Sequence, residues 1–247
     1  MRIVQRDGYA LVAERHGKGP PHVLCLHGLA DTRAIWTRVF PSFVASGAFL
    51  RVDQRGHGDS SSPDPPYRLE DLAADAVAVL DSWSIDRAVL VGHSMGGVVA
   101  LTAALAFPGR VAGLVLLGTT SQLNAPEAAW YEKIAAAGET QGIDGIRPAI
   151  FGAGSEREIV ADALAIAGIA RALAGLHRQP LTPRLGEVSC PAAVLIGERD
   201  PMGVAASNIL AEGMPGARLT VVPGRGHWLQ LEAPEAVVSA ADAVLRG

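Results

Sequence analysis

The chain has 247 residues, with 25 acidic side chains against 21 lysines and arginines and a formal net charge of -4 at pH 7. This length suffices for one large domain with a well-buried core, or for two small ones. The charge gives no electrostatic footprint for nucleic acid, and no basic block would hold a membrane surface. No apolar stretch reaches membrane-spanning length, and the first residues lack the apolar core of a secretion signal. We therefore expect a cytoplasmic protein, without membrane insertion, that is a monomer or a homodimer.

The first part of the chain alternates strand-like and helix-like segments. Residues 3–15 alternate apolar and polar side chains and predict a hairpin that turns at Asp7 and Gly8. Residues 22–28 and 48–56 are short, continuous apolar runs, as expected of buried strands in a parallel sheet. The segment between them, residues 32–44, is predicted to form a helix.

The same alternation continues toward the middle of the chain. Residues 69–83 place apolar side chains at helical spacing and predict an amphipathic helix. Residues 87–94 form a buried strand that passes at once into a helix over 95–108, and residues 110–119 form the next strand. Strands and helices in this order predict a doubly wound α/β sheet.

Residues 121–186 contain no strand-like run and are predicted to form short helices. Pro126 suits the first turn of one helix, and Ser155 with Glu158 resembles a capping box that would begin another. Apolar residues of that second helix would share one face: Ile159, Ile166, Ile169, Leu173 and Leu176.

The alternation resumes after this helical segment. Residues 190–200 and 218–224 are strand-like, with a helix between them, and a final helix covers 234–246. The sequence thus predicts one α/β core made of residues 1–120 and 187–247, with residues 121–186 inserted as a small helical cap.

A short motif at the junction of strand and helix indicates a nucleophile. Gly92, Ser94 and Gly96 fit the pattern G-x-S-x-G, in which a sharp strand-to-helix turn exposes a strained serine. Glycines on both sides remove side chains that would collide in the turn. The hydroxyl then lies at a helix N-terminus, where the helix dipole favours developing negative charge. An incidental serine in a glycine-rich turn is the alternative, and the flanking strand and helix argue against it.

A serine hydroxyl is a poor nucleophile unless a base lies beside it. His227 follows the strand at 218–224 and precedes the last helix, where a loop could bring it over Ser94. His93 adjoins the serine, but neighbouring side chains of such a turn diverge. The remaining histidines are assigned to surface positions or to loops with other roles: His16, His22, His27, His57 and His177.

An acid is needed to orient the histidine and to stabilise its imidazolium form. Asp200 ends the strand at 190–200, and the chain order serine, aspartate, histidine is the one that accompanies this serine motif. Asp53 is a rival, although Arg55 and turn amides would satisfy its charge more simply. Glu198 is a nearer alternative, two residues from Asp200.

The tetrahedral intermediate of acyl transfer needs preorganised donors for its oxyanion. The backbone N–H of Met95, directly after the serine, is one candidate. The backbone N–H of Leu29, in the loop after the first buried strand, is the other, and Gly28 would let that backbone approach the substrate.

These motifs resemble those of the α/β-hydrolase superfamily, and they occur in the family's order over nearly all of the chain outside the insertion. The matching segments are residues 26–36, 52–60, 91–97, 107–119, 195–200 and 224–228. Within the superfamily, the sequence is most similar to small carboxylesterases and 3-oxoadipate enol-lactone hydrolases.

The resemblance implies an α/β-hydrolase fold, with a mostly parallel sheet of about eight strands flanked by helices and a small helical cap. It also implies Ser94, Asp200 and His227 as the catalytic triad, with Leu29 and Met95 as oxyanion donors. A structural turn would contain Asp53, Arg55, Gly56 and Gly58.

The expected reaction is hydrolysis of a small carboxylic ester or lactone through an acyl-enzyme on Ser94, with no metal and no organic cofactor. Candidate substrate-binding residues are Trp130, Ile150, Phe151 and Trp228, with Leu123, Ile134 and Met202 as further apolar candidates. Each of them could equally be a packing residue. A substrate carboxylate could be bound by Arg147, Arg171 or Arg178, for which a solvated surface is the simpler interpretation.

Other functions share this framework. Hydrolysis of thioesters or of carbon–carbon bonds and cofactor-free perhydrolysis use the same three side chains, and neither fold nor triad separates them. A non-catalytic small-molecule receptor that retains the triad is the alternative from another class.

Overall fold

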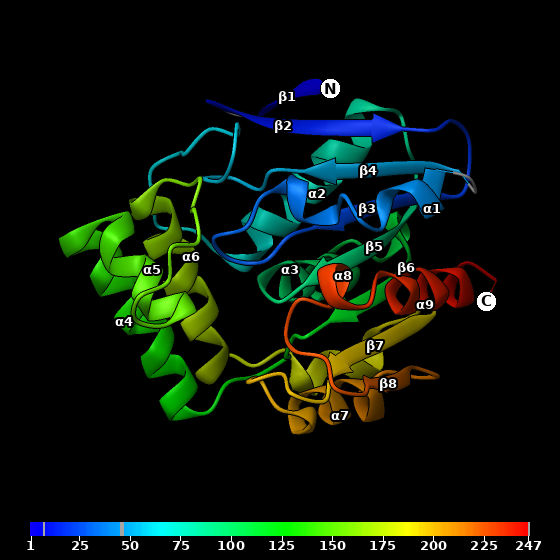
Figure 1. Cartoon of the computed structure of the whole chain (residues 1–247). Coiled ribbons are helices and arrows are strands. Elements are labelled where there is room, and N and C mark those ends of the chain that lie inside the picture. Colours follow the sequence, from blue (N-terminus) through cyan, green and yellow to red (C-terminus); the bar gives the residue numbers. More distant parts are fainter. Residues whose placement is uncertain (7, 45–46, 247) are drawn as a thin grey trace.

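The computed structural model describes residues 1–6, 8–44 and 47–246, and its strands form one sheet (Figure 1). The strands of these described ranges are β1 (Arg2–Arg6), β2 (Tyr9–His16), β3 (His22–Leu26), β4 (Ala48–Val52), β5 (Ala88–His93), β6 (Val111–Leu117), β7 (Ala192–Gly197) and β8 (Arg218–Val222). Their order across the eight-stranded sheet is β1-β2-β4-β3-β5-β6-β7-β8. Only the pairs β1·β2 and β2·β4 are antiparallel, so the predicted mostly parallel sheet of eight strands is confirmed.

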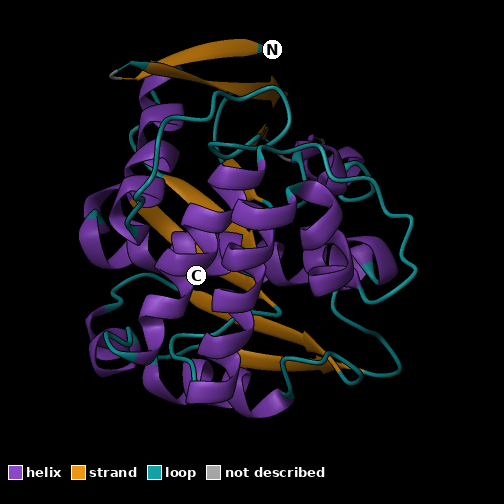
Figure 2. Ribbon diagram, turned by 90° about the vertical axis from the view of Figure 1, so that its left-hand side faces the viewer, coloured by secondary structure: helices purple, strands orange, loops and turns teal. Residues whose placement is uncertain are grey.

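The predicted N-terminal hairpin is present at one edge of the sheet, at the top of Figures 1 and 2. Its register runs from Arg2 opposite Ala13 to Arg6 opposite Tyr9. The predicted turn residue Asp7 lies outside the described residues.

Helices cover both faces of the sheet (Figure 2). The α-helices of the described ranges are α1 (Phe40–Val44), α2 (Leu69–Ser82), α3 (Met95–Ala106), α4 (Ala125–Gln141), α5 (Ile143–Phe151), α6 (Ala163–Ala174), α7 (Val204–Gly213), α8 (Leu229–Glu232) and α9 (Pro234–Arg246). Alternate side chains of each buried strand point to opposite faces. Leu24 and Leu26 therefore join the core under α2 and α3, while Val23 and Cys25 join the core under α1 and α9.

The predicted helix over residues 32–44 is wrong as a single element. The chain instead forms a 3-10 turn, η1 (Arg33–Trp36), and the short helix α1. Pro41 explains the break, because its ring would collide with the carbonyl four residues earlier in a continuous helix and is tolerated only in a first turn. Helix α1 accordingly begins one residue before Pro41.

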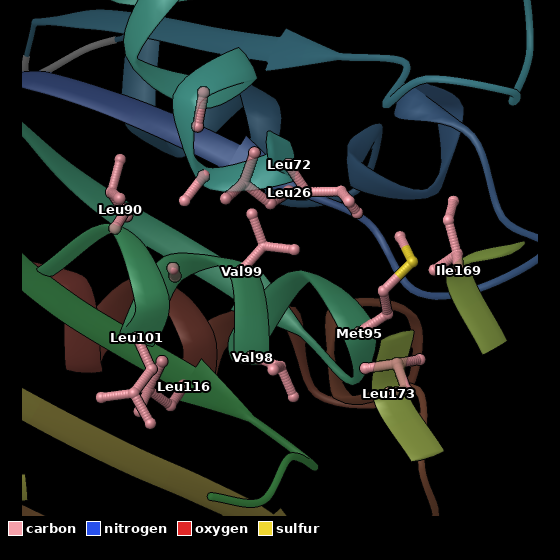
Figure 3. Close-up of a cluster of buried hydrophobic side chains, with 14 of the residues drawn as sticks. Leu26, Leu72, Leu90, Met95, Val98, Val99, Leu101, Leu116, Ile169 and Leu173 are labelled. Carbon is pink, nitrogen blue, oxygen red and sulfur yellow. The ribbon is translucent and has the colours of Figure 1, made fainter. Parts of the chain in front are cut away.

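The helical segment between β6 and β7 comprises α4, α5, α6 and two 3-10 turns, η3 (Gly175–His177) and η4 (Thr182–Glu187). Helices α4, α5 and α6 lie to one side of the sheet, at the left of Figure 1, where β4 ends. Pro126 lies in the first turn of α4, whose N-cap is Asn124. Figure 3 shows the side chain of Met95, at the start of α3, close to Ile169 of α6.

The predicted helix start at Ser155 is wrong, because α6 begins at Ala163 with Asp162 as its N-cap. Residues 155–160 run without helical structure beside a core loop. Gly58 N–H donates to the carbonyl of Val160 at 2.7 Å, and Asp162 N–H donates to the carbonyl of Gly56 at 2.8 Å. These tertiary hydrogen bonds use backbone groups that a helix would have paired internally. Ile159 and Leu176, which were predicted to share a face of this helix, lie outside α6, although both are buried. Among the described residues, no helix is long and apolar enough to span a bilayer.

Candidate active site

Ser94 occupies a tight turn between β5 and α3, with φ 53° and ψ -117°. Few residues other than glycine adopt a positive φ, so this backbone is strained. A Cβ at Gly92 would lie 2.2 Å from the carbonyl oxygen of Gly96, and a Cβ at Gly96 would lie 2.1 Å from that of Leu26. The turn therefore requires both glycines of the predicted motif, because any larger residue would strike backbone atoms.

His227 is held by Asp200, on the loop that follows β7. The imidazole Nδ1 lies 2.8 Å from Asp200 Oδ2, and the other carboxylate oxygen accepts the backbone N–H of Met202 at 2.9 Å. The Asp200 side chain is fully buried. Because a carboxylate can only accept, Nδ1 carries the proton and Nε2 is left as an acceptor. The pair thus presents a basic nitrogen.

Ser94 and His227 line the same cavity, whose volume is about 490 Å³. Within the described part of the chain, the Ser94 hydroxyl makes no hydrogen bond. It is therefore free to rotate toward the imidazole, and such catalytic hydrogen bonds often tighten only when substrate is bound.

Gly118, at the end of β6, lies against the Asp200–His227 pair. Its φ is +49°, and a Cβ there would lie 2.7 Å from Asp200 Oδ2 and 3.0 Å from His227 Nδ1. The sequence analysis did not single out this glycine. A glycine that directly follows a buried strand, at the edge where the triad is expected, is the signal that could have identified it.

His93 contacts His227 through its ring and through a hydrogen bond to the His227 backbone. Its Nε2–H donates to the backbone carbonyl of His227 at 3.0 Å, and the two ring centroids are 4.6 Å apart. Burial lowers the pKa of His93 well below its usual value, so the ring is neutral. The sequence analysis set His93 aside as a base and missed this supporting contact.

Two buried histidines hold the loop that contains Leu29. His57 Nε2 accepts the N–H of Ala30 at 3.2 Å, and His27 Nε2 accepts the N–H of Gln54 at 3.0 Å. Burial lowers the pKa of both imidazoles, which keeps them neutral and able to accept. These contacts supply the structural role that the sequence left open for these two histidines.

The backbone N–H groups of Leu29 and Met95 donate no hydrogen bond to any described residue. Leu29 lines the cavity, and Met95 begins α3 directly after Ser94. The first N–H groups of a helix have no partner within the helix. Both N–H groups are therefore without a hydrogen-bond partner among the described residues.

The rivals of Asp200 have other partners. Asp53 accepts the backbone N–H of Arg33 at 2.7 Å and pairs with its guanidinium group. The prediction that Arg55 pairs with Asp53 is wrong, because the Arg55 guanidinium pairs with Asp75 at 2.7 Å. Glu198 is exposed and accepts the N–H of Gly224 at 2.7 Å.

The cavity wall is largely apolar. Of the predicted substrate-binding residues, Trp130, Ile150 and Trp228 line the cavity, together with Leu123 and Met202. Phe151 and Ile134 are not among the lining residues. The ring of Phe151 lies 6.1 Å from that of Trp228, centroid to centroid, and Ile134 of α4 is completely buried.

The predicted arginines do not line the cavity. Arg147 pairs with Asp144, and Arg171 pairs with two glutamates of α4, Glu132 and Glu139. Arg178 is exposed and is not among the lining residues. Arg157, which the sequence analysis did not mention, donates instead to Asp31 on the cavity wall. Within the described ranges, no three His, Cys, Asp or Glu side chains are grouped so that they could hold a metal ion.

Comparison with known proteins identifies the family to which this fold belongs. Residues 23–241 match the alpha/beta hydrolase family, so the chain belongs to that family. The chain is 27% identical to 3-oxoadipate enol-lactonase 2 of Acinetobacter baylyi, over 92% of this chain and 89% of the relative.

Solved structures show the same fold. A hydrolase from Pseudomonas aeruginosa is 26% identical and superimposes with a TM-score of 0.88, covering 100% of this chain and 98% of its own. A thermophilic esterase from Thermogutta terrifontis is also 26% identical, with a TM-score of 0.83 over 96% of this chain and 93% of its own. The chain is thus a hydrolase with lactonases and esterases among its relatives.

Proposed function

We propose that this chain hydrolyses small carboxylic esters or lactones through an acyl-enzyme on Ser94, with residues 121–186 as a cap over the site. The observation that carries the proposal is the Asp200–His227 hydrogen bond beside a strained serine in one apolar cavity. The lactonase and the esterase among the relatives support an ester or lactone bond as the bond that is cleaved.

The chemistry follows from the protonation states. His227 Nε2 takes the proton of Ser94 Oγ as the hydroxyl attacks the substrate carbonyl, and Asp200 stabilises the resulting imidazolium. The N–H groups of Leu29 and Met95 bind the oxyanion. The imidazolium then protonates the leaving alcohol, and a water activated by Nε2 releases the acid and regenerates Ser94.

The first test is turnover of 4-nitrophenyl butyrate by the wild type and by Ser94→Ala. We expect multiple turnovers for the wild type and a loss of at least about 10³-fold in the variant, since nucleophile removal leaves only the contributions of binding and the oxyanion donors. Ser239→Ala is the matched control, because Ser239 is exposed on α9. Retention of a tenth of the activity by Ser94→Ala would refute the serine mechanism, and a single slow turnover in the wild type would indicate a receptor.

A further inference from the structure

A charged pair crosses from the cap to the cavity wall beside the candidate oxyanion loop. Arg157 lies in the segment between α5 and α6, and its guanidinium donates to Asp31 Oδ1 at 2.5 Å. Asp31 follows the loop of Gly28 and Leu29 and lines the same cavity as Ser94. The contact thus joins two segments 126 residues apart.

The guanidinium of Arg157 is fixed on its other sides as well. Its central carbon lies 4.6 Å from the ring centroid of Phe151 and 4.6 Å from that of Trp228. The Asp31 side chain is 5% exposed, and its Oδ2 accepts the indole N–H of Trp228 at 3.4 Å. A planar guanidinium between two rings and a carboxylate has its charge satisfied and its position restricted.

Asp31, which lines the cavity, balances the positive charge of Arg157. Among the described residues that line the cavity, none is a lysine or an arginine, whereas two are acidic, Asp31 and Glu127. A substrate carboxylate in this cavity would lose its hydration without gaining a cation, and it would also face the Asp31 oxygens. Burial of an unpaired charge is costly, and a like charge nearby increases that cost.

We infer that the Asp31–Arg157 pair is a specificity determinant that restricts the substrate to esters or lactones whose acyl and alcohol groups are uncharged. This inference rests on the proposed function and names its substrate class. Phe151, which does not line the cavity, then acts indirectly by holding Arg157 against Asp31. Removal of the Asp31 charge would free the guanidinium to bind a substrate carboxylate.

The test compares two esters of equal chain length, 4-nitrophenyl hexanoate and the 4-nitrophenyl monoester of adipic acid, after subtraction of the uncatalysed rates. We expect the wild-type kcat/KM to favour hexanoate by more than tenfold. In Asp31→Asn, this preference should fall by more than threefold, and Asp31→Ser is the substitute if the first variant does not fold. Because the preference is a ratio within each variant, general damage to the site cancels.

Two further variants separate the roles of the two charges. In Arg157→Gln, the preference for hexanoate should stay at or above that of the wild type. In the double variant Asp31→Asn/Arg157→Gln, the preference for hexanoate over the adipic monoester should fall less than in Asp31→Asn, because no guanidinium remains to bind the substrate carboxylate. Asp144→Asn is the matched control, since it removes the same charge from an exposed cap position, and its ratio should stay within twofold of the wild type.

Two outcomes would overturn the inference: a wild-type preference below tenfold, or a change below threefold in the Asp31 variant. Either result would leave the proposed function intact as long as hexanoate is turned over and Ser94→Ala abolishes that turnover. Absence of any Ser94-dependent ester turnover would instead refute the proposed function itself.

Discussion

Gly118 and Ser94 both have a positive φ directly after a buried strand. Gly118 lies against the imidazole of the candidate site, and Ser94 lines the same cavity as that imidazole. Their roles differ. The backbone at Ser94 presents the hydroxyl, whereas Gly118 leaves the space that Asp200 and His227 need to approach each other. A position without a side chain can therefore control the geometry of a catalytic pair.

Substitution of Gly118 by alanine tests that role. The added Cβ would lie within 3.0 Å of both members of the pair, so we expect kcat to fall by about 10²-fold, as misplacements of about 1 Å can cause. The positive φ should cost a further ~1 kcal/mol of stability. Steady-state kinetics and urea unfolding measure the two effects. Gly109→Ala, where a Cβ meets nothing within 4 Å, is the control, and equal kcat values in both variants would contradict the assignment.

The identity of the acid is tested separately with Asp200→Asn. An amide at this position favours the wrong tautomer of His227, so turnover should fall by about 10⁴-fold while the fold is retained. Circular dichroism and ester kinetics provide the measurement. Glu198→Gln should change turnover by less than threefold, because Glu198 is exposed and bonded to Gly224. If turnover in Asp200→Asn falls by less than tenfold, Glu198 rather than Asp200 is the acid that orients His227.

At the scale of elements, the cap depends on the close approach of α4 to α6. A Cβ at Gly138 of α4 would lie 2.8 Å from the carbonyl oxygen of Ala163, in the first turn of α6, and 3.1 Å from Ile146 of α5. Three helices therefore meet at a position where only glycine fits.

We expect Gly138→Ala to destabilise the protein, even though alanine is the better helix former, because overpacking costs about 1–3 kcal/mol. The melting temperature should fall by about 2–6 °C in a chain of this size. Gly175→Ala is the matched cap control. Its φ is -55° and a Cβ would meet nothing within 4 Å, so the melting temperature should stay the same or rise slightly. The assignment fails if Gly138→Ala melts no lower than Gly175→Ala.

The helices and strands of the core can be predicted from local sequence patterns, whereas part of the cap cannot. Strands and the turn at Ser94 are predictable because alternation, apolar runs and glycine spacing are local in sequence. The Ser155 pattern fails because Val160 and Asp162 hydrogen-bond to the loop at 56–58, about a hundred residues away. The contact between Arg157 and Asp31 is equally nonlocal, and no spacing rule connects them.

For the whole molecule, the buried imidazoles connect stability to pH. The pKa values of His27, His57 and His93 are lowered by burial, so these rings stay neutral in the folded chain. Unfolded histidines bind a proton below about pH 6.5. The unfolded state therefore takes up more protons as the pH falls, and the free energy of unfolding must decrease below that value.

We expect a loss on the order of 3 kcal/mol between pH 7.5 and 5.5, measured by urea unfolding at both pH values. Carboxylates contribute in a different window. Burial alone would raise the pKa of Glu14, but hydrogen bonds from Arg33 and Arg51 outweigh it and lower this pKa to about 2. The stability that Glu14 contributes is therefore lost only below about pH 4.5. An unfolding free energy that stays constant down to pH 5.5 would contradict the neutral assignment of the three rings.

The backbone hydrogen bonds between residues 56–58 and 160–162 also affect how a ligand enters the cavity. They attach the start of α6 to the core, close to where Arg157 meets Asp31. A cap that is attached to the core in this way cannot move away as a rigid body without breaking these main-chain hydrogen bonds. Ligand exchange should then proceed by rotation of cavity-lining side chains, on the nanosecond scale of rotamer changes rather than the slower scale of hinge motions.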